Sequence, residues 1–179
     1  MITKENPRGM TRRELLQTGT AFTAAFIAGT GFLAHADDAW AMELKALKPK
    51  AMATLIQMAR DIYPHDRLAD HFYAVAMKGH DEKAAGDAGH KKLIEDGVAT
   101  LDAMAVDAGA PSYARMGWEI DRNRLLRQIE TTPFFQAIRG GMITGLYNQK
   151  EVWPYFGYEG ESFSKGGYIE RGFNDIAWL

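Results

Sequence analysis

The hydrophobic pattern between about residues 49 and 147 has the period of α-helices that bury one face. The stretch AMATLIQMARDIY predicts a helix that begins near Pro49 and ends before Pro64. Proline fits the first turn of a helix and disfavours helical geometry in the residue that precedes it. The predicted inner face of this helix holds Met52, Leu55, Ile56, Ala59 and Ile62.

Four further helices follow from the same spacing. The second passes through Leu68, Phe72, Val75 and Ala76 and is predicted to end at Gly79, and the polar stretch HDEKAAGDAG is predicted to be a linker. The third spans about residues 91–108, with Leu93, Ile94, Val98, Leu101, Met104 and Ala105 facing inward. The fourth spans about residues 119–130 and the fifth residues 133–147, where Thr132 is the predicted N-cap and Pro133 lies in the first turn.

Three glycines interrupt the fifth helix, namely Gly140, Gly141 and Gly145. Each weakens a helix by about 1 kcal/mol relative to alanine, so we expect them to permit close packing. No stretch of alternating apolar and polar residues is long enough to predict a strand. The fold class is therefore predicted to be all-α, with a small helical bundle over residues 37–152.

The C-terminal segment, residues 153–179, has a different composition. Its sequence, WPYFGYEGESFSKGGYIERGFNDIAWL, lacks a helical period and is rich in glycine and aromatic residues. Two interpretations are open: the segment covers the core of its own bundle, or it docks on another protein, since aromatic residues are enriched in buried interface contacts. The predicted docking residues are Trp153, Tyr155, Phe156, Tyr158, Tyr168, Phe173 and Trp178, with Lys165, Glu170, Arg171 and Asp175 as a polar rim.

The first 36 residues have the order of parts found in a twin-arginine export signal. Thr11, Arg12 and Arg13 are followed by Leu15 and Leu16, and no charged residue occurs from Thr18 to Ala34. Ala34-His35-Ala36 is a small-x-small cleavage sequence, and a second cut at Ala41 is open. An ordinary amphipathic helix and an uncleaved signal that anchors the chain to the membrane are the alternatives. We therefore expect export to the periplasm through the twin-arginine translocon.

Composition narrows the chemistry of the chain. Its 46% hydrophobic and 25% charged residues are typical of a globular protein, and a net charge of -2 gives no nucleic-acid footprint. The absence of cysteine excludes disulfides, thiolate zinc sites and iron–sulfur clusters. The histidines at 65, 71, 80 and 90 have no zinc-type spacing on one helix, so we expect solvated or capping histidines and no metal site. No serine lies in a nucleophile elbow, and no catalytic or cofactor-binding residue is predicted in this chain.

Three features together resemble the gluconate 2-dehydrogenase subunit 3 family: the leader, the helix TLIQMARDIYPHD, and the element WPYFGYEG. These are the small, or gamma, subunits of periplasmic flavoprotein dehydrogenases. The resemblance implies a large catalytic partner of the glucose-methanol-choline oxidoreductase type that holds FAD, and a cytochrome c or similar electron carrier. In the family the large subunit commonly lacks its own export signal and is carried across with the small one.

The predicted function is therefore that of an accessory subunit that carries the signal and escorts a flavoprotein. An independent periplasmic binding or scaffold protein is the alternative, and a hydrolase that uses scattered Asp and His residues is a third. The substrate of the complex belongs to the partner.

Overall fold

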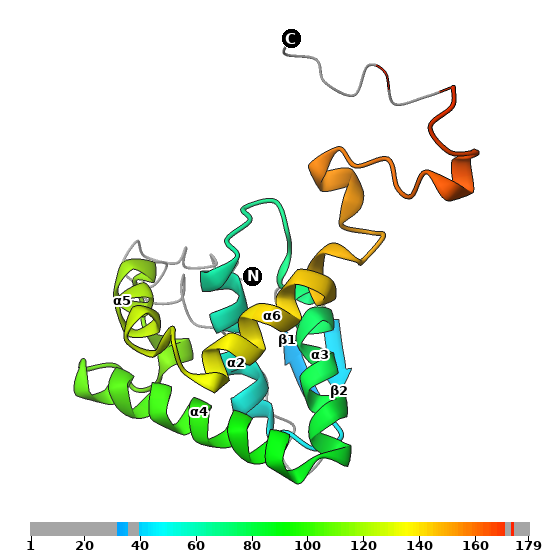
Figure 1. The fold of residues 1–179 in the computed structure, drawn as a ribbon. Coiled ribbons are helices and arrows are strands. Elements are labelled where there is room, and N and C mark those ends of the chain that lie inside the picture. Colours follow the sequence, from blue (N-terminus) through cyan, green and yellow to red (C-terminus); the bar gives the residue numbers. More distant parts are fainter. Residues whose placement is uncertain (1–31, 36–39, 171–172, 174–179) are drawn as a thin grey trace, which may run out of the picture.

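A computed structural model of the chain describes residues 32–35, 40–170 and 173. These residues are mostly helical, which confirms the predicted all-α class (Figure 1). The α-helices are α2 (Pro49–Ile62), α3 (Asp70–Gly86), α4 (Ala88–Asp107), α5 (Glu119–Ile129) and α6 (Pro133–Tyr147). Short 3-10 turns occur at η1 (Tyr113–Arg115), η2 (Trp153–Phe156) and η3 (Phe163–Lys165). Within the described part of the chain, no helix combines the length and the apolar character needed to cross a bilayer.

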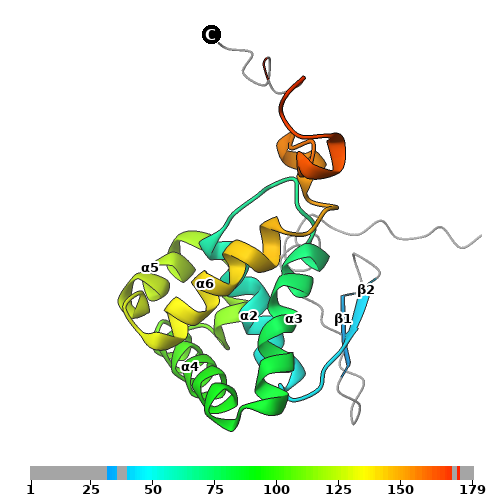
Figure 2. The same cartoon turned by 45° about the vertical axis from the view of Figure 1, so that its right-hand side comes forward.

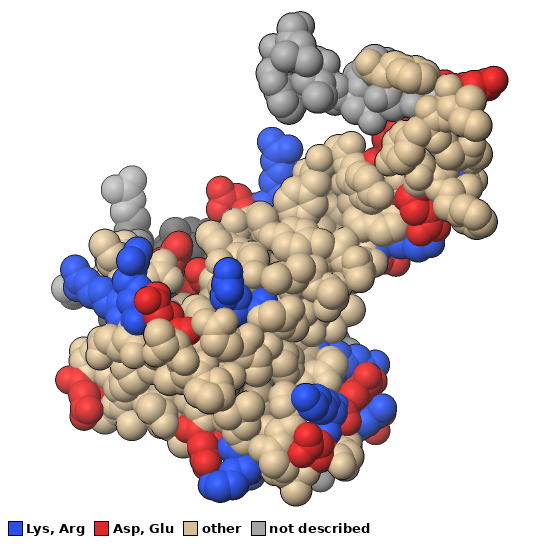
Figure 3. Space-filling model, viewed as in Figure 1, with Lys and Arg blue, Asp and Glu red and all other residues tan. Residues whose placement is uncertain are grey.

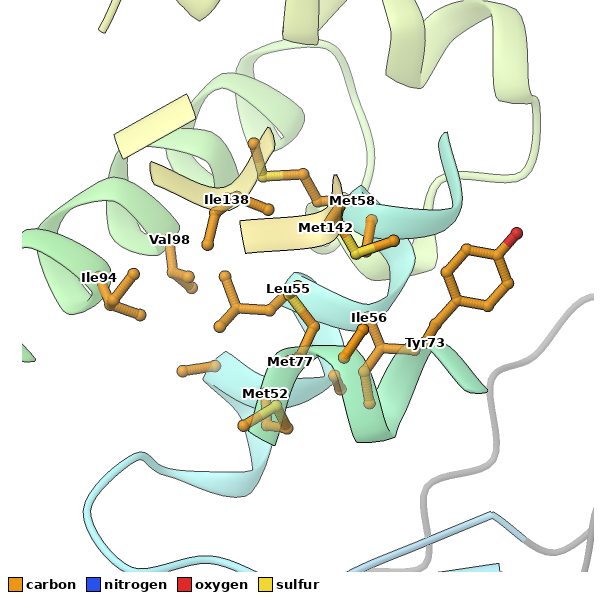
Figure 4. Close-up of a cluster of buried hydrophobic side chains, with 14 of the residues drawn as sticks. Met52, Leu55, Ile56, Met58, Tyr73, Met77, Ile94, Val98, Ile138 and Met142 are labelled. Carbon is orange, nitrogen blue, oxygen red and sulfur yellow. The ribbon is translucent and has the colours of Figure 1, made fainter. Parts of the chain in front are cut away.

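Helix α2 is the centre of the bundle. It begins at Pro49 and ends at Ile62, before Pro64, as predicted. Met52, Leu55, Ile56 and Met58 are fully buried, so α2 is covered on more than the one face that the pattern predicted. Side chains of α3, α4 and α6 meet it from several directions, among them Tyr73, Met77, Ile94, Val98, Ile138 and Met142 (Figure 4). The interior is therefore a single hydrophobic core built around α2.

Glycines let the outer helices approach closely. A Cβ atom on Gly145 of α6 would lie 3.0 Å from the backbone oxygen of Ala76 in α3. A Cβ atom on Gly97 of α4 would lie 2.2 Å from Cγ of Phe134 in α6. The expected packing role of the glycines in α6 is thus confirmed at Gly145, whereas a Cβ atom on Gly140 would meet nothing within 4 Å.

The predicted linker after Gly79 is wrong. Helix α3 continues through Gly79 to Gly86, and α4 begins at Ala88, with Asp87 as an N-cap that accepts a hydrogen bond from the His90 backbone N–H at 2.9 Å. The stretch looks polar because its buried face is polar: His80 and Asp81 are both buried there. Conversely Val75, predicted to face inward, is 52% exposed.

Asp81 explains how such a polar face is tolerated. Its Oδ1 accepts hydrogen bonds from the backbone N–H groups of Ala46 (3.0 Å) and Leu47 (2.7 Å), and its Oδ2 accepts one from Lys45 (2.7 Å). A buried carboxylate paired with several backbone donors avoids the cost of an unsatisfied charge. The contact fixes the segment before α2 against α3.

A short hairpin precedes α2, although the sequence predicted no strand. Strand β1 (Phe32–His35) pairs antiparallel with β2 (Trp40–Glu43), with Ala34 opposite Ala41, and the hairpin lies beside α3 in both ribbon views (Figures 1 and 2). Strands of four residues are too short to show a clear alternation. Apart from Phe32–His35, the predicted signal peptide, including its twin-arginine residues and Ala36, lies outside the described residues.

Candidate functional site

The base of the C-terminal segment is fixed to the bundle. Val152 is fully buried, and Trp153 Nε1 donates a hydrogen bond to the Tyr147 carbonyl at 2.7 Å. The side-chain amide of Gln149 donates to the carbonyl of Phe72 at 2.8 Å and to that of Gly145 at 2.7 Å. These contacts tie the end of α6 to the start of α3.

Two predicted docking residues, Tyr155 and Phe156 in η2, contact the bundle edge to face. The Phe156 ring lies 4.9 Å from the His65 ring at 74°, and the Tyr155 ring lies 5.7 Å from Phe72 at 71°. Nε2 of His65 also lies 2.8 Å from the Tyr147 hydroxyl, within hydrogen-bond range. Burial lowers the pKa of His65, against the raising effect of Asp66, which favours the neutral ring. Tyr155 and Phe156 nevertheless stay about half exposed.

Beyond Gly157 the segment leaves the bundle. Gly157 has a φ of 71° and Gly160 a φ of 99°, left-handed values that favour glycine and redirect the chain. The segment projects from the bundle in both ribbon views, and Figure 3 shows it as a lobe on which acidic side chains lie among uncharged ones. Its large apolar side chains are exposed: Tyr158 49%, Phe163 93%, Tyr168 59%, Ile169 86% and Phe173 81%.

The segment therefore has two parts with different contacts. We name residues 153–157 the anchored base and residues 158–173 the distal arm. The anchored base covers part of the bundle, whereas the described contacts of the distal arm are with that base and with the turn after α6. The Tyr158 ring lies 5.2 Å from the Trp153 ring, and Lys150 Nζ lies 3.5 Å from Glu161 Oε1. The predicted docking set omits Phe163 and Ile169, although their side chains are the most exposed large apolar ones in the described part of the distal arm. Trp178, Arg171 and Asp175 lie outside the described residues.

A buried ionic network joins α2 to α5, and sequence reasoning missed it. Nε of Arg122 donates to Asp61 Oδ2 at 2.7 Å, and its Nη2 donates to Oδ1 at 2.8 Å. The Tyr113 hydroxyl donates to Asp61 Oδ2 at 2.6 Å, and burial together with the Asp61 charge raises the pKa of Tyr113. The Asp61 side chain is only 2% exposed, so the network holds helices together and is closed to ligands.

The histidines do not all lie where they were expected. His80 and His90 are both buried, and Nδ1 of His80 lies 3.1 Å from Nε2 of His90, so the prediction of solvated or capping histidines is wrong for this pair. The two residues are ten positions apart on different helices, which no single-helix spacing reveals. Among the described residues, no group of three or more His, Cys, Asp or Glu side chains is placed to hold a metal ion.

A cavity of about 370 Å³ lies between β2 and α3. Met42, Ala74 and Val75 supply apolar lining, and the remaining lining residues are Glu43, Lys45, His71 and Lys78. Ligand sites usually combine an apolar lining with a few fixed polar groups. Here Lys45 forms an exposed ion pair with Glu82, so at least one of the polar groups points to solvent rather than into the cavity.

The fold and the projecting segment define a class: a small helical bundle with an exposed aromatic arm. Comparisons of the chain with protein-family models, with curated proteins and with solved structures found no match. Function is therefore inferred from the chain's own residues and contacts.

Proposed function

We propose that this chain is the small accessory subunit of a periplasmic, FAD-dependent sugar or alcohol dehydrogenase complex. The chain carries a twin-arginine signal and escorts a catalytic subunit of the glucose-methanol-choline type, which holds FAD. A cytochrome c or a similar carrier takes the electrons from that subunit. No residue of this chain has a catalytic role in this proposal.

The observation that carries the proposal is the exposed apolar surface of the distal arm. Burial of apolar area is favourable by about 25 cal/mol per Å², and a partner that covers the arm would gain the part of this that exceeds the entropic cost of association. Aromatic side chains that enter pockets of a partner are the usual hot spots of an interface. Such an exposed apolar surface is typical of a chain that binds a partner and is unusual for a monomer.

The two motifs of the family resemblance also meet in space, which supports the proposal. The motif TLIQMARDIYPHD forms most of α2 and the loop after it, and WPYFGYEG forms η2 and the left-handed turn at Gly157. Phe156 of the second motif packs on His65 of the first. Residues about ninety positions apart in the sequence are therefore in contact at the point where the chain enters the distal arm.

Purification tests the proposal. The chain expressed alone is expected to contain no flavin and to show no dehydrogenase turnover, whereas the tagged chain from its native host is expected to bring along a flavoprotein of about 60 kDa. Flavin absorbance and mass spectrometry of the eluate are the measurements. Stoichiometric flavin in the chain expressed alone would refute the proposal, and a flavin-free chain from the native host would favour an independent binding or scaffold protein.

The export step yields its own prediction. Arg12→Lys combined with Arg13→Lys keeps the positive charge but removes the guanidinium groups, and lysine does not replace arginine where geometry is recognised. We expect both the chain and its flavoprotein to stay in the cytoplasm of this double variant, as measured by immunoblots of periplasmic and cytoplasmic fractions. Arg8→Lys, outside the arginine pair, serves as the matched control and should be exported. A flavoprotein that reaches the periplasm with the double variant would contradict the escort role.

A further inference from the structure

The turn between α3 and α4 holds a buried pair of histidines. His80 lies in the last part of α3 and His90 in the first turn of α4, with only Asp87 between the two helices. Their exposed fractions are 9% and 7%. The pair therefore joins the two helices at the point where the chain reverses.

The geometry is that of a head-on hydrogen bond. The ring planes differ by 14° and the ring centroids are 5.3 Å apart, while the facing nitrogens are 3.1 Å apart. At these distances the two nitrogens lie nearly on the line that joins the centroids, so the rings are almost coplanar and meet edge to edge. Such a bond needs one facing nitrogen with a proton and one without. It survives a single added proton, but two protonated rings would place two N–H groups against each other.

The surroundings offer little to offset added charge. A Cβ atom on Gly141 would lie 2.6 Å from His80 Nε2, so α6 meets this ring with the backbone of a glycine. Lys83 of α3 is a nearby cation, and Asp87 at the start of α4 is the nearby anion, exposed and already bound to the His90 backbone N–H. Burial, His90 and Lys83 lower the pKa of His80 to about 4, and burial and Lys83 lower the pKa of His90.

We propose that the His80–His90 pair is an acid-operated lock on the α3–α4 turn, which closes when the pair shares at most one extra proton and opens when both rings are protonated. The role is independent of the accessory-subunit function. In the unfolded chain each histidine takes up a proton near its ordinary pKa of 6.5, but in the folded chain it does so only at lower pH. The stabilising effect is therefore complete above about pH 6.5 and is lost as the pH falls toward 4, in two coupled steps.

The test uses a variant that keeps the bond but cannot titrate. Asparagine places its amide near the position of Nδ1 and glutamine places its amide near that of Nε2, so His80→Asn with His90→Gln can retain a neutral hydrogen bond. Urea unfolding at several pH values between 7.5 and 4.5 measures how the stability of the whole protein depends on pH. Hydrogen exchange of the amides in residues 80–94, corrected for intrinsic rates, measures how opening of the α3–α4 turn depends on pH.

We expect the unfolding equilibrium of the unaltered chain to shift at least about tenfold further toward the unfolded state than that of the double variant between pH 7.5 and 4.5. Faster exchange at 80–94 should accompany the shift, and His71→Asn, away from the pair, should follow the unaltered chain. The pKa of His65 is also lowered, but His65 is present in every variant, so its contribution to the pH dependence of stability cancels in the comparison. Equal pH dependence in the double variant and the unaltered chain would overturn the proposal.

A direct titration decides the matter if the double variant does not fold. The imidazole ring signals of the unaltered chain are followed by NMR from pH 8 to pH 4. Both rings of the pair titrating below their ordinary pKa would support the lock. Both rings titrating at or above about 6.5 would overturn it.

Discussion

At the scale of single residues, Asp61 is a buried charge whose hydrogen-bonding capacity is satisfied by side chains from other parts of the bundle. It accepts a bidentate pair from Arg122 of α5 and a hydrogen bond from Tyr113 of η1, and Gln57 Nε2 donates to its Oδ1 at 3.1 Å. A buried ion pair repays its desolvation cost only when its remaining hydrogen-bonding capacity is satisfied, as it is here. Loss of the carboxylate would leave the guanidinium of Arg122 without its counter-charge.

This arrangement predicts a graded series of destabilisation. Asp61→Ala should lower the free energy of unfolding by about 3 to 5 kcal/mol, because it leaves a buried charge unpaired. Tyr113→Phe should lower it by about 1.5 to 3 kcal/mol, because it removes one hydrogen bond to a charged group. Asp121→Ala, which breaks an exposed pair with Arg124, is the control and should change it little. Urea unfolding at pH 7 measures all three, and an equal effect of Asp61→Ala and Asp121→Ala would contradict the role given to the network.

Such residues were hard to find in the sequence for a physical reason. Asp61 and Arg122 are 61 positions apart, and each looks like a charge on a solvated helix face. Their burial depends on how α5 is placed against α2, which no local pattern encodes. The same holds for His80 and His90, whose partnership depends on the turn between α3 and α4.

At the scale of elements, boundaries were predictable where local chemistry determines them. Helix α6 has the predicted bounds because the Thr132 hydroxyl caps it, accepting from the Phe135 N–H at 3.3 Å, and Pro133 fits its first turn. The end of α3 differs from the prediction because Gly79, which is exposed on the outer side of the helix, does not stop it. The buried contacts of His80 and Asp81 carry the helix past that glycine.

Two glycines give a test of the close packing between α4 and α6. Gly97→Ala should destabilise the protein by about 1 to 3 kcal/mol, because the new methyl group would overlap the Phe134 ring. Gly140→Ala on α6 is the matched control: its methyl group meets nothing, so the better helix propensity of alanine should raise stability by about 0.5 to 1 kcal/mol. Thermal unfolding followed by circular dichroism measures both changes. A stabilising Gly97→Ala would show that the helices are further apart than described.

At the scale of the whole molecule, the bundle and the distal arm differ in how far their apolar side chains are buried. The bundle buries most of its large apolar side chains around α2, with Val152 among them, and the anchored base adds Trp153 and the edge contacts of Tyr155 and Phe156. The sequence showed that residues 153–179 are aperiodic but not where covering ends and exposure begins. That division falls at Gly157 because a left-handed residue turns the chain away from α6. Docking of the distal arm stays a prediction.

The division also defines which residues a docking test should change. Tyr155 and Phe156 contact the bundle, so their replacement would confuse folding with binding. Tyr158, Tyr168 and Phe173 lie beyond Gly157, and truncation of a true interface anchor costs about 2 kcal/mol or more, which is about thirtyfold in affinity. Val106→Ser with Ile120→Ser is the matched control, since these side chains are 57% and 63% exposed on α4 and α5.

The most direct measurement is the FAD retained by the full chain when it is purified from its native host as bait. The unaltered chain and the Val106→Ser, Ile120→Ser control should retain stoichiometric FAD through their flavoprotein partner. The triple variant Tyr158→Ser, Tyr168→Ser, Phe173→Ser should lose it, while its helical circular dichroism signal stays unchanged. An unaltered chain that retains no flavin, or a triple variant that retains as much as the control, would contradict the assignment of this chain as a subunit that docks a flavoprotein through its distal arm.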